Sequence, residues 1–521
     1  MPTGPDQASK PRFPQESKPN HAVRFVLLVA LALSLAWFAA DKFWLTRQRA
    51  GEGRGATVTA TQAAAAGAAI DDRSIVVLPF ANTSPDPEQA YYADGLAAEL
   101  RDRLAQVSGL RVPGHTSSFY FKGKEATTAE IGRVLAVAYV LDGRVGRSGG
   151  TLHVIAQLTR ADKGERLWSK TYERDARDVF AVQDAITQAV VESLHAPAVP
   201  PRRATNPQRP VVLEAYDQYL MGNSLRDRGT PDGWRLALAA YRKAVALDPD
   251  DAATYAGLTL AETAIADAAG DDAGNKRAMA AAERAVALAP DLAAGYAVRG
   301  YMRYSYAWDW GGAQADFEKA LALDPIEPIA LRRYAGLLES LGRLPEAMVV
   351  IERLIKSDPL SDAGWMNLGL AQYSAGRIAD ARQSLSRALE INADAVYGQY
   401  HRGFVELIDG KAQNALALFR QVGDPVFVLT GGAMAEHTLG HERESQQMLA
   451  ELVRSHARTA AFQIAEVYAW CGGKDQAFSW LERAYRQRDG GLSLIKTDPP
   501  LAALHSDLRF AAMLRKMKLP E

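Results

Sequence analysis

The chain has 521 residues, of which 48% are apolar and 23% charged, and its formal net charge is -1. This length points to several domains, this composition excludes a wholly disordered chain, and the balanced charge excludes a general attraction to nucleic acid. The one cysteine, Cys471, excludes an intramolecular disulfide and a cysteine-based zinc site within one chain.

The N-terminal region predicts a polar tail followed by a membrane anchor. Residues 1–22 are polar and contain prolines, so we expect them to be disordered. Residues 25–40 read FVLLVALALSLAWFAA without a charge, and the flanking Arg24 and Lys42 can lengthen the span by reaching toward the headgroups. A cleaved signal peptide would need small residues at a cleavage site behind this run, and the sequence there matches one poorly. We therefore predict a single transmembrane helix over 23–45.

Two linkers divide the rest of the chain. Residues 46–72 are alanine-rich, and residues 197–210 are rich in proline without helical periodicity. Four basic residues lie on each side of the apolar run, so the positive-inside rule assigns no orientation to the helix.

Residues 73–196 predict a small α/β domain. β-branched runs predict strands, and apolar residues spaced four apart predict helices. Thr128 is expected to cap the second helix. The predicted strands are 74–80, 109–113, 139–145, 152–159 and 166–172, and the predicted helices are 88–107, 128–135 and 178–194.

This region resembles the TolB-like (FlgO-like) amino-terminal domain. The resemblance rests on SIVVLPFANTSPDPEQAYYADGLAAELRDRLAQV, on RVPGHTSSFYFKGK, and on the stretch from AYVLDGRVGRSGG to RDVFAVQDAI. It implies an extracytoplasmic sensing or scaffolding domain. Relatives commonly carry a cytoplasmic winged-helix or nucleotide cyclase domain ahead of the membrane helix, and the 22 residues before the apolar run are too few for either.

Residues 211–490 show an internal repeat. Asp-Pro or Ala-Pro pairs recur with prolines at 249, 290, 325 and 359, which are 41, 35 and 34 residues apart. The unit 362–393 places Trp365, Leu368 and Gly369 in a W-x2-L-G pattern, with Gly376 at the turn. This pattern and the period of about 34 residues resemble the tetratricopeptide repeat. We expect seven or eight helical hairpins, and a C-terminal segment over 491–521 that caps them. The predicted fold class is therefore α+β and multi-domain: a transmembrane helix, a TolB-like α/β domain and an all-α superhelical solenoid.

Stacked hairpins of this kind leave a concave face that can hold a protein or peptide. A carboxylate clamp of the type found in chaperone-binding relatives is not expected, because Gly336 stands where that clamp has asparagine. The repeat position of each residue gives eight candidates for partner binding: Arg332, Arg333, Asn367, Leu370, Tyr373, Tyr400, His401 and Phe404.

No motif predicts enzymatic chemistry, so we expect no catalytic, cofactor-binding or metal-binding residue. Gly146–Gly150 matches G-x-S-x-G but lies between two predicted strands, which favours a hairpin turn over a nucleophile elbow. His437 and His441 have the spacing of metal ligands on one helix, but Gly440 is expected to end that helix.

Three hypotheses for function follow. The first is a non-enzymatic scaffold or sensor, anchored in the inner membrane with its bulk in the periplasm, that binds partner proteins in the repeat groove. The second is a signalling component of a transmembrane transcriptional-regulator or cyclase-type system that lacks its own output domain. The third is an enzyme with an unrecognised site in the α/β domain.

Overall fold

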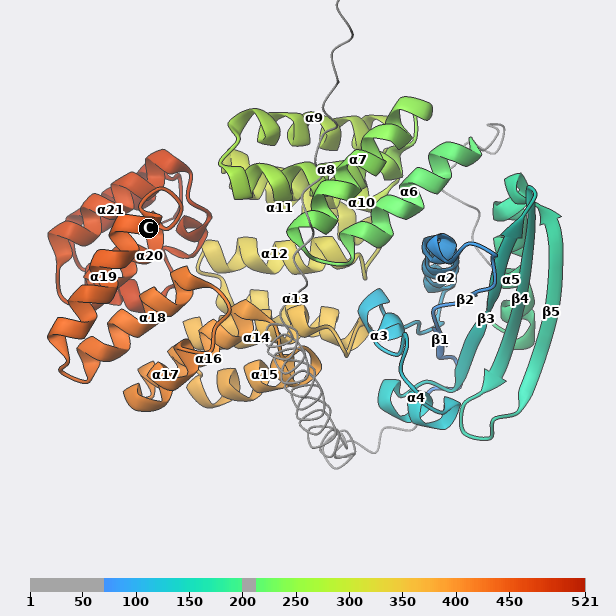
Figure 1. Ribbon diagram of the computed structural model, residues 1–521, viewed down its shortest axis with the longest axis horizontal. Helices are drawn as coiled ribbons and strands as arrows, with labels where there is room; N and C mark the ends of the chain where they lie inside the picture. The colour runs from blue at the N-terminus through green and yellow to red at the C-terminus, as the bar shows by residue number, and fades with distance from the viewer. Residues whose placement is uncertain (1–69, 199–211, 521) are drawn as a thin grey trace, which may run out of the picture. The chain divides into compact units, whose positions relative to one another are not determined.

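The computed structural model describes residues 70–198 and 212–520 (Figure 1). Residues Ile70–Glu521 form one compact unit. The predicted tail, transmembrane helix and most of both linkers lie outside the described residues. Among the described helices, none is long and apolar enough to cross a bilayer.

The first part, which we call the sheet domain, is a mixed sheet with helices on both faces. Strand β3 pairs in parallel with β1 and β2 and antiparallel with β4, which pairs antiparallel with β5. The strands are β1 (Ile75–Val77), β2 (Ala81–Asn82), β3 (Tyr139–Ser148), β4 (Thr151–Arg160) and β5 (Arg166–Asp175), and the helices are α2 (Ala90–Ala105), α3 (His115–Phe119), α4 (Thr128–Leu135) and α5 (Val179–Ser193).

Alternating residues of β1 supply the two apolar cores of the sheet domain. Ile75 and Val77 pack into the core that contains residues of α2 and α5. Val76 packs into the second core with Ile131 and Leu135 of α4.

Two details of the predicted sheet domain are wrong. Residues 109–113 form no strand. Within this segment Arg111 alone pairs with another residue, in an isolated β-bridge with Ser74. Helix α4 is capped by Thr127 rather than Thr128, because the Thr127 side chain accepts from the Glu130 amide and Glu130 accepts from the Thr127 amide in return.

The second part, which we call the array, consists of eight described hairpins, within the expected number. Their helices pair in chain order as α6 (Leu213–Arg226) with α7 (Pro231–Leu247), α8 (Ala252–Ala269) with α9 (Asp272–Leu288), α10 (Ala293–Met302) with α11 (Trp310–Leu323), α12 (Pro328–Ser340) with α13 (Leu344–Ser357), α14 (Asp362–Ser374) with α15 (Ile378–Ile391), α16 (Val396–Ile408) with α17 (Ala412–Phe419), α18 (Pro425–Thr438) with α19 (Glu442–His456), and α20 (Ala461–Trp470) with α21 (Lys474–Gln487).

Local sequence rules explain the hairpins. The turn of five successive hairpins contains a glycine in the left-handed region, where side chains are strained: Gly342, Gly376, Gly410, Gly440 and Gly472, with φ between +72° and +82°. The paired helices approach closely at small residues. A Cβ atom on Gly369 would lie 2.6 Å from Leu385 Cγ of the facing helix.

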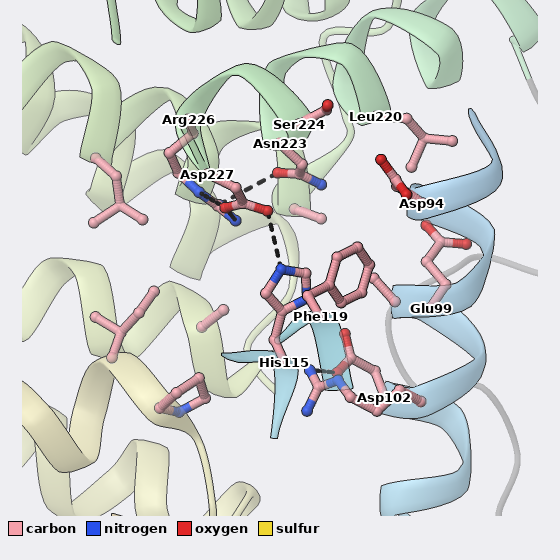
Figure 2. A pocket seen from close by; sticks show the side chains of 18 of the residues that line it. Asp94, Glu99, Asp102, His115, Phe119, Leu220, Asn223, Ser224, Arg226 and Asp227 are labelled. Carbon is pink, nitrogen blue, oxygen red and sulfur yellow. Dashed lines mark hydrogen bonds and ion pairs between the residues drawn. The ribbon is translucent and has the colours of Figure 1, made fainter. Parts of the chain in front are cut away.

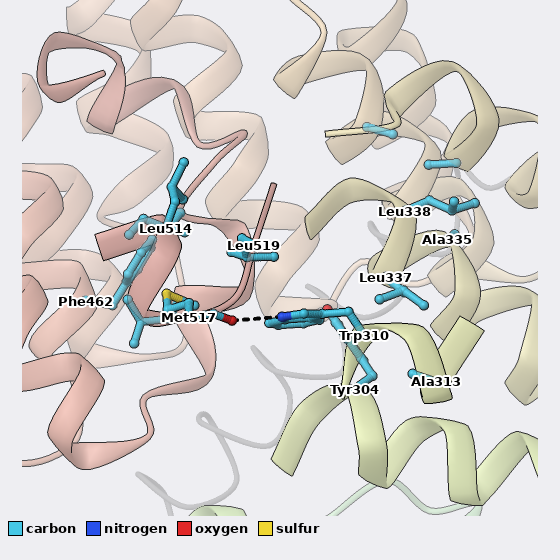
Figure 3. Packing of buried hydrophobic residues seen from close by; sticks show 14 of the residues in the cluster. Tyr304, Trp310, Ala313, Ala335, Leu337, Leu338, Phe462, Leu514, Met517 and Leu519 are labelled. Carbon is cyan, nitrogen blue, oxygen red and sulfur yellow. Dashed lines mark hydrogen bonds between the residues drawn. The ribbon is translucent and has the colours of Figure 1, made fainter. Parts of the chain in front are cut away.

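The chain ends in the C-terminal segment, which comprises η5 (Gly490–Leu494), η6 (Pro499–Leu504) and α22 (Leu508–Lys516). This segment caps the last hairpin and also reaches α11 and α12. Trp310 of α11 donates a hydrogen bond from Nε1 to the carbonyl oxygen of Met517 at 2.9 Å, and Leu514, Met517 and Leu519 belong to the same buried cluster as Leu337 and Leu338 (Figure 3). Repeats far apart in sequence therefore share one core.

Candidate partner-binding cleft

A cleft of about 3230 Å³ lies between the sheet domain and the array. Helices α2 and α3 line one side, and α6 with its following loop lines another. The loops that join successive hairpins, from Asp248 to Asp394, supply much of the remaining wall. Three of these loops carry an Asp-Pro pair, and the aspartates of those pairs, Asp248, Asp324 and Asp358, line the cleft.

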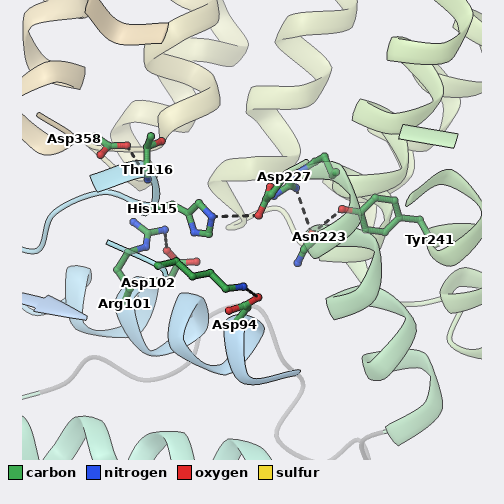
Figure 4. Close-up of polar contacts among 11 residues, drawn as sticks. Asp94, Arg101, Asp102, His115, Thr116, Asn223, Asp227, Tyr241 and Asp358 are labelled. Atoms are coloured by element: carbon green, nitrogen blue, oxygen red, sulfur yellow. Dashed lines mark hydrogen bonds and ion pairs between the residues drawn. The ribbon is translucent and has the colours of Figure 1, made fainter. Parts of the chain in front are cut away.

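Asp358 of one such loop fastens the sheet domain to the array. Its carboxylate accepts hydrogen bonds from the amides of Thr116, at 3.2 Å, and Ser117, at 2.7 Å, and from the Ser117 hydroxyl (Figure 4). In return the amide of Leu360 donates to Ser117 Oγ at 2.9 Å. Asp358 is 6% exposed, so these bonds are shielded from water.

Helix α6 makes a second junction with the sheet domain. Arg147 Nη1 lies 2.7 Å from Asp217 Oδ1, and both side chains are largely buried. The Tyr216 hydroxyl donates to Glu99 Oε2 at 2.7 Å, and the Tyr216 ring meets Tyr92 edge-on. Burial, with the nearby Glu99, raises the pKa of Tyr216 well above its usual value, so this hydroxyl stays a donor.

A group of polar side chains links α3 to the end of α6 across the cleft (Figure 2). His115 Nε2 lies 3.2 Å from Asp227 Oδ2, and Arg226 Nη2 lies 2.9 Å from Asp227 Oδ1. The His115 ring stacks on Phe119. Burial alone would raise the pKa of Asp227, but the charge of Arg226 and the hydrogen bond from His115 outweigh burial and hold that pKa below its usual range. Asp227 is therefore an anionic link between the two parts.

Two of the predicted residues, Arg332 and Arg333 on α12, line this cleft. Their Nε atoms are buried without a hydrogen-bond partner, and neither side chain forms an ion pair with any described residue. The Arg333 guanidinium lies 3.8 Å above the Tyr301 ring. The charge of Arg333, together with burial, lowers the pKa of Arg332 to about 10. Two adjacent cations without a carboxylate partner favour an incoming anion.

The rest of the cleft is acidic. Sixteen Asp and Glu residues line it against eight Arg and Lys residues, so Arg332 and Arg333 form a basic site in acidic surroundings. Burial raises the pKa of one lining carboxyl, Glu327, to about 7.

Four other predicted residues do not line an open groove. Tyr373, Tyr400, His401 and Phe404 are between 1% and 8% exposed. The three rings of Tyr373, Tyr400 and Phe404 belong to one apolar core with residues of α18 and α20. The expectation that this face is open is wrong, because α18 and α20 of later hairpins pack over it. Their role in partner binding stays a prediction.

The remaining two predicted residues lie on α14. Asn367 and Leu370 are partly exposed, and Leu370 packs against the core that contains Tyr373. They do not line the cleft, so the structure separates the eight predicted residues into three groups.

The motifs set aside above have structural roles. Gly149 and Gly150 form the turn between β3 and β4, with φ of +57° and +87°. His437 and His441 each pair with a glutamate, Glu442 and Glu436 respectively, both at 2.7 Å. Across residues 70–198 and 212–520, no group of three His, Cys, Asp or Glu side chains could hold a metal ion.

The sequence did not indicate His115, Asp227 or Asp358 as members of one site. They come from three elements, and the bonds that join Asp358 to α3 span 241 and 242 residues. The repeated Asp-Pro pairs are recognisable in the sequence, but they predict only helix ends and not the lining of a cleft.

Family comparisons agree with the hairpin architecture. Tetratricopeptide repeat families match residues 307–368, 349–396 and 366–423. Residues 307–423 therefore match tetratricopeptide repeats, whose stacked hairpins commonly take part in protein–protein interaction.

Among curated proteins, the chain is similar to one from Rhizobium meliloti (strain 1021) named "Putative adenylate cyclase 3". The two are 35% identical over 188 residues, which is 36% of this chain and 32% of the relative. The chain thus spans about a third of the length of that relative.

Solved structures with similar helical repeats share low sequence identity. PilW, a type IV pilus biogenesis factor, is 19% identical over 40% of this chain and 98% of its own, with a TM-score of 0.34. YrrB, described as a protein with an unusual peptide-binding site, is 20% identical over 36% and 91%, with a TM-score of 0.25. The Cut9–Hcn1 complex is 14% identical over 64% and 59%, with a TM-score of 0.41.

Proposed function

We propose that the chain is a membrane-anchored scaffold that binds a partner protein in the cleft between the sheet domain and the array. Its N-terminal apolar helix holds it in the inner membrane, and the described parts lie in the periplasm. The sheet domain is the TolB-like domain inferred from the sequence. The protein catalyses no reaction, and its output is the complex that it assembles.

The observation that carries this proposal is the unpaired couple Arg332 and Arg333 on a wall of the cleft. Both side chains are partly buried, and a partly buried cation without a carboxylate partner favours a complex in which an anionic group reaches it. A polypeptide segment with a carboxylate can supply that group. The acidic surroundings then favour basic residues on either side of the carboxylate. The expected partner segment is therefore of mixed charge, with an acidic residue at its centre.

Site-specific photo-crosslinking in cells tests this binding mode. A photoreactive residue in place of Ala294, which lines the cleft, is expected to capture a partner, whereas the same residue in place of Val349, which is 59% exposed on α13, is not. Reversing the charge of both Arg332 and Arg333 to glutamate is expected to reduce capture at Ala294 at least about tenfold. The matched control reverses Arg454 and Arg458, two exposed residues near the end of α19. Equal capture at both positions, or no loss on reversal of Arg332 and Arg333, would contradict the proposal.

The predicted topology has a separate test. A C-terminal reporter enzyme that is active only after export should be active in cells. An inactive, stably produced fusion would place the described parts in the cytoplasm and leave the cleft proposal intact.

A second candidate is a signalling component of a cyclase-type system, favoured by the similarity to the relative named as an adenylate cyclase. Cyclic AMP would then change when the gene for the chain is deleted, and return with the unaltered chain. An unchanged level of cyclic AMP under conditions in which the chain is produced would count against this candidate.

A further inference from the structure

A second, smaller cavity of about 540 Å³ lies on the array, and we call it the inner cavity. Its rim includes exposed turn residues of two hairpins, Gly342 and Gly376, and Ala502 of η6. Its walls include Leu344, Ile378 and Ile408. It is independent of the cleft described above.

Two buried polar side chains line the inner cavity with unused atoms. Tyr373 is 1% exposed and Asp498 is 9% exposed, and neither Tyr373 Oη nor Asp498 Oδ2 has a hydrogen-bond partner. Polar atoms at this depth are usually paired, since an unpaired one loses its hydrogen bonds to water without replacing them. Two such atoms in one cavity point to a ligand.

Three more unused polar atoms lie next to these two. They are Tyr400 Oη, His401 Nδ1 and Glu466 Oε2, all on side chains no more than 8% exposed. The His401 ring lies 6.3 Å from the Tyr373 ring and 5.3 Å from the Tyr400 ring. The cluster therefore combines two carboxyl groups, two phenol hydroxyls and an imidazole.

The two carboxyl groups of this cluster, Glu466 and Asp498, share a hydrogen bond with each other. Neither Glu466 nor Asp498 forms an ion pair with a described Arg or Lys residue. Burial raises the pKa of Asp498 to about 7, and burial together with Asp498 raises the pKa of Glu466 well above its usual value. Burial lowers the pKa of His401 to about 4, so this ring is neutral and adds no positive charge. A cation that donates several hydrogen bonds would stabilise both carboxylates.

The best-matched cation is a guanidinium group. It has five N–H donors in one plane, binds carboxylates through two parallel hydrogen bonds, and lies favourably on aromatic rings. The aliphatic walls suit a short methylene stem that reaches from the rim to Asp498. We propose that the inner cavity binds a guanidinium group on an aliphatic stem.

Lys496 is the lysine among the residues that line the inner cavity. Its Nζ donates to the carbonyl oxygen of Pro520 at 2.8 Å, which directs the ammonium toward the chain end. Lys496 therefore does not occupy the place that the guanidinium would take beside Asp498.

Calorimetric titration of the purified full chain with agmatine tests this proposal. Agmatine carries a guanidinium on a four-carbon stem, and we expect saturable binding. Asp498→Asn is expected to weaken it at least about tenfold, because it removes the negative charge and turns one acceptor oxygen into a donor, and Tyr373→Phe about threefold, because it removes the hydroxyl. The matched control is Glu482→Gln, which changes a half-exposed carboxylate on α21 away from the inner cavity. Tyr373→Phe retains the ring, so it keeps the test valid if Asp498→Asn does not fold.

A blocked tripeptide, Gly-Arg-Gly, distinguishes the two sources of the guanidinium. Tighter binding of the tripeptide than of agmatine assigns the inner cavity to an arginine side chain of a polypeptide, and the reverse assigns it to a free small molecule. The proposal is overturned if neither probe binds at 10 mM, because a Kd of about this value is near the weak end of specific binding. Equal binding by the unaltered chain and both cavity variants also overturns it.

Discussion

Substitution of Asp358 by alanine should loosen the sheet domain from the array. The Asp358 carboxylate receives two amide hydrogen bonds and one hydroxyl hydrogen bond from the start of α3. Each bond to an ionised acceptor contributes about 1.5–3 kcal/mol, and an abandoned buried donor costs about 1–3 kcal/mol. Because the three bonds share one acceptor, their effects do not add. We therefore expect a loss of about 3–5 kcal/mol in the free energy that holds α3 against the array.

Hydrogen exchange measured by mass spectrometry can locate this loss. Peptides that cover 115–119 should exchange about a hundredfold faster or more in Asp358→Ala, because local opening becomes easier by at least about 3 kcal/mol. Exchange in α18 should not change. Asp358→Asn retains one acceptor oxygen and should give an intermediate result.

Asp424→Ala is the matched control. Asp424 also accepts a backbone hydrogen bond, from Val426 at 2.8 Å, but only within its own helix α18. Its loss should cost about 1 kcal/mol, as for other helix caps, and leave 115–119 protected. If Asp358→Ala and Asp424→Ala gave the same exchange at 115–119, the fastening role of Asp358 would be refuted.

Three further predictions concern stability, measured by urea unfolding. Burial raises the pKa of Glu339 to about 8, so between pH 4.5 and 8 the folded protein holds a proton that the unfolded chain has lost. The free energy of unfolding should therefore fall by up to about 1.4 kcal/mol per pH unit in this range. Glu339→Gln should reduce this slope, and an unchanged slope would count against the burial argument. A Cβ atom on Gly257 would lie 2.6 Å from Tyr241 Cε1, so Gly257→Ala should lower the free energy of unfolding by about 1–3 kcal/mol. The double variant with Tyr241→Leu should lose less stability than the sum of the two single variants. Strict additivity of the two losses would refute the close contact. Trp310→Phe should cost about 1 kcal/mol through its lost bond to Met517, and Trp310→Ala about 3–5 kcal/mol, whereas no cost for Trp310→Phe would show that the indole nitrogen contributes nothing.

The hairpins of the array were predictable because their signals are local. A proline cannot continue a helix, and a glycine adopts the left-handed conformation without strain. Gly376 and Pro359 therefore mark the same positions in the sequence and in the structure. The same local logic placed the turn at Gly149 and Gly150.

The covering of the inner face was not predictable from this periodicity. A helix that faces a groove and a helix that faces another helix have the same apolar spacing. The residue types held the better signal, since Tyr373, Tyr400 and Phe404 would together expose a large aromatic patch to water. Residues of α18 and α20 bury these rings and so remove that patch from water.

The cleft was unpredictable for a different reason. The contact between Asp358 and α3 joins residues more than 240 positions apart. Nothing near Asp358 distinguishes it from the aspartates of the other Asp-Pro pairs. Arg332 and Arg333 were predicted from their repeat position, and they line the cleft rather than a concave face.

The contact between the C-terminal segment and α11 changes how the repeats melt. In an open solenoid each repeat contacts only its neighbours, so the terminal repeat frays first and the rest survive. Here Trp310 and Met517 meet across 207 residues, so the last hairpin is held from both sides. Loss of that hairpin would bare apolar surface on α12 as well as on its neighbours in sequence. The repeats from α10 to the chain end should therefore behave as one cooperative block, in which the ends are as resistant to heat and protease as the middle.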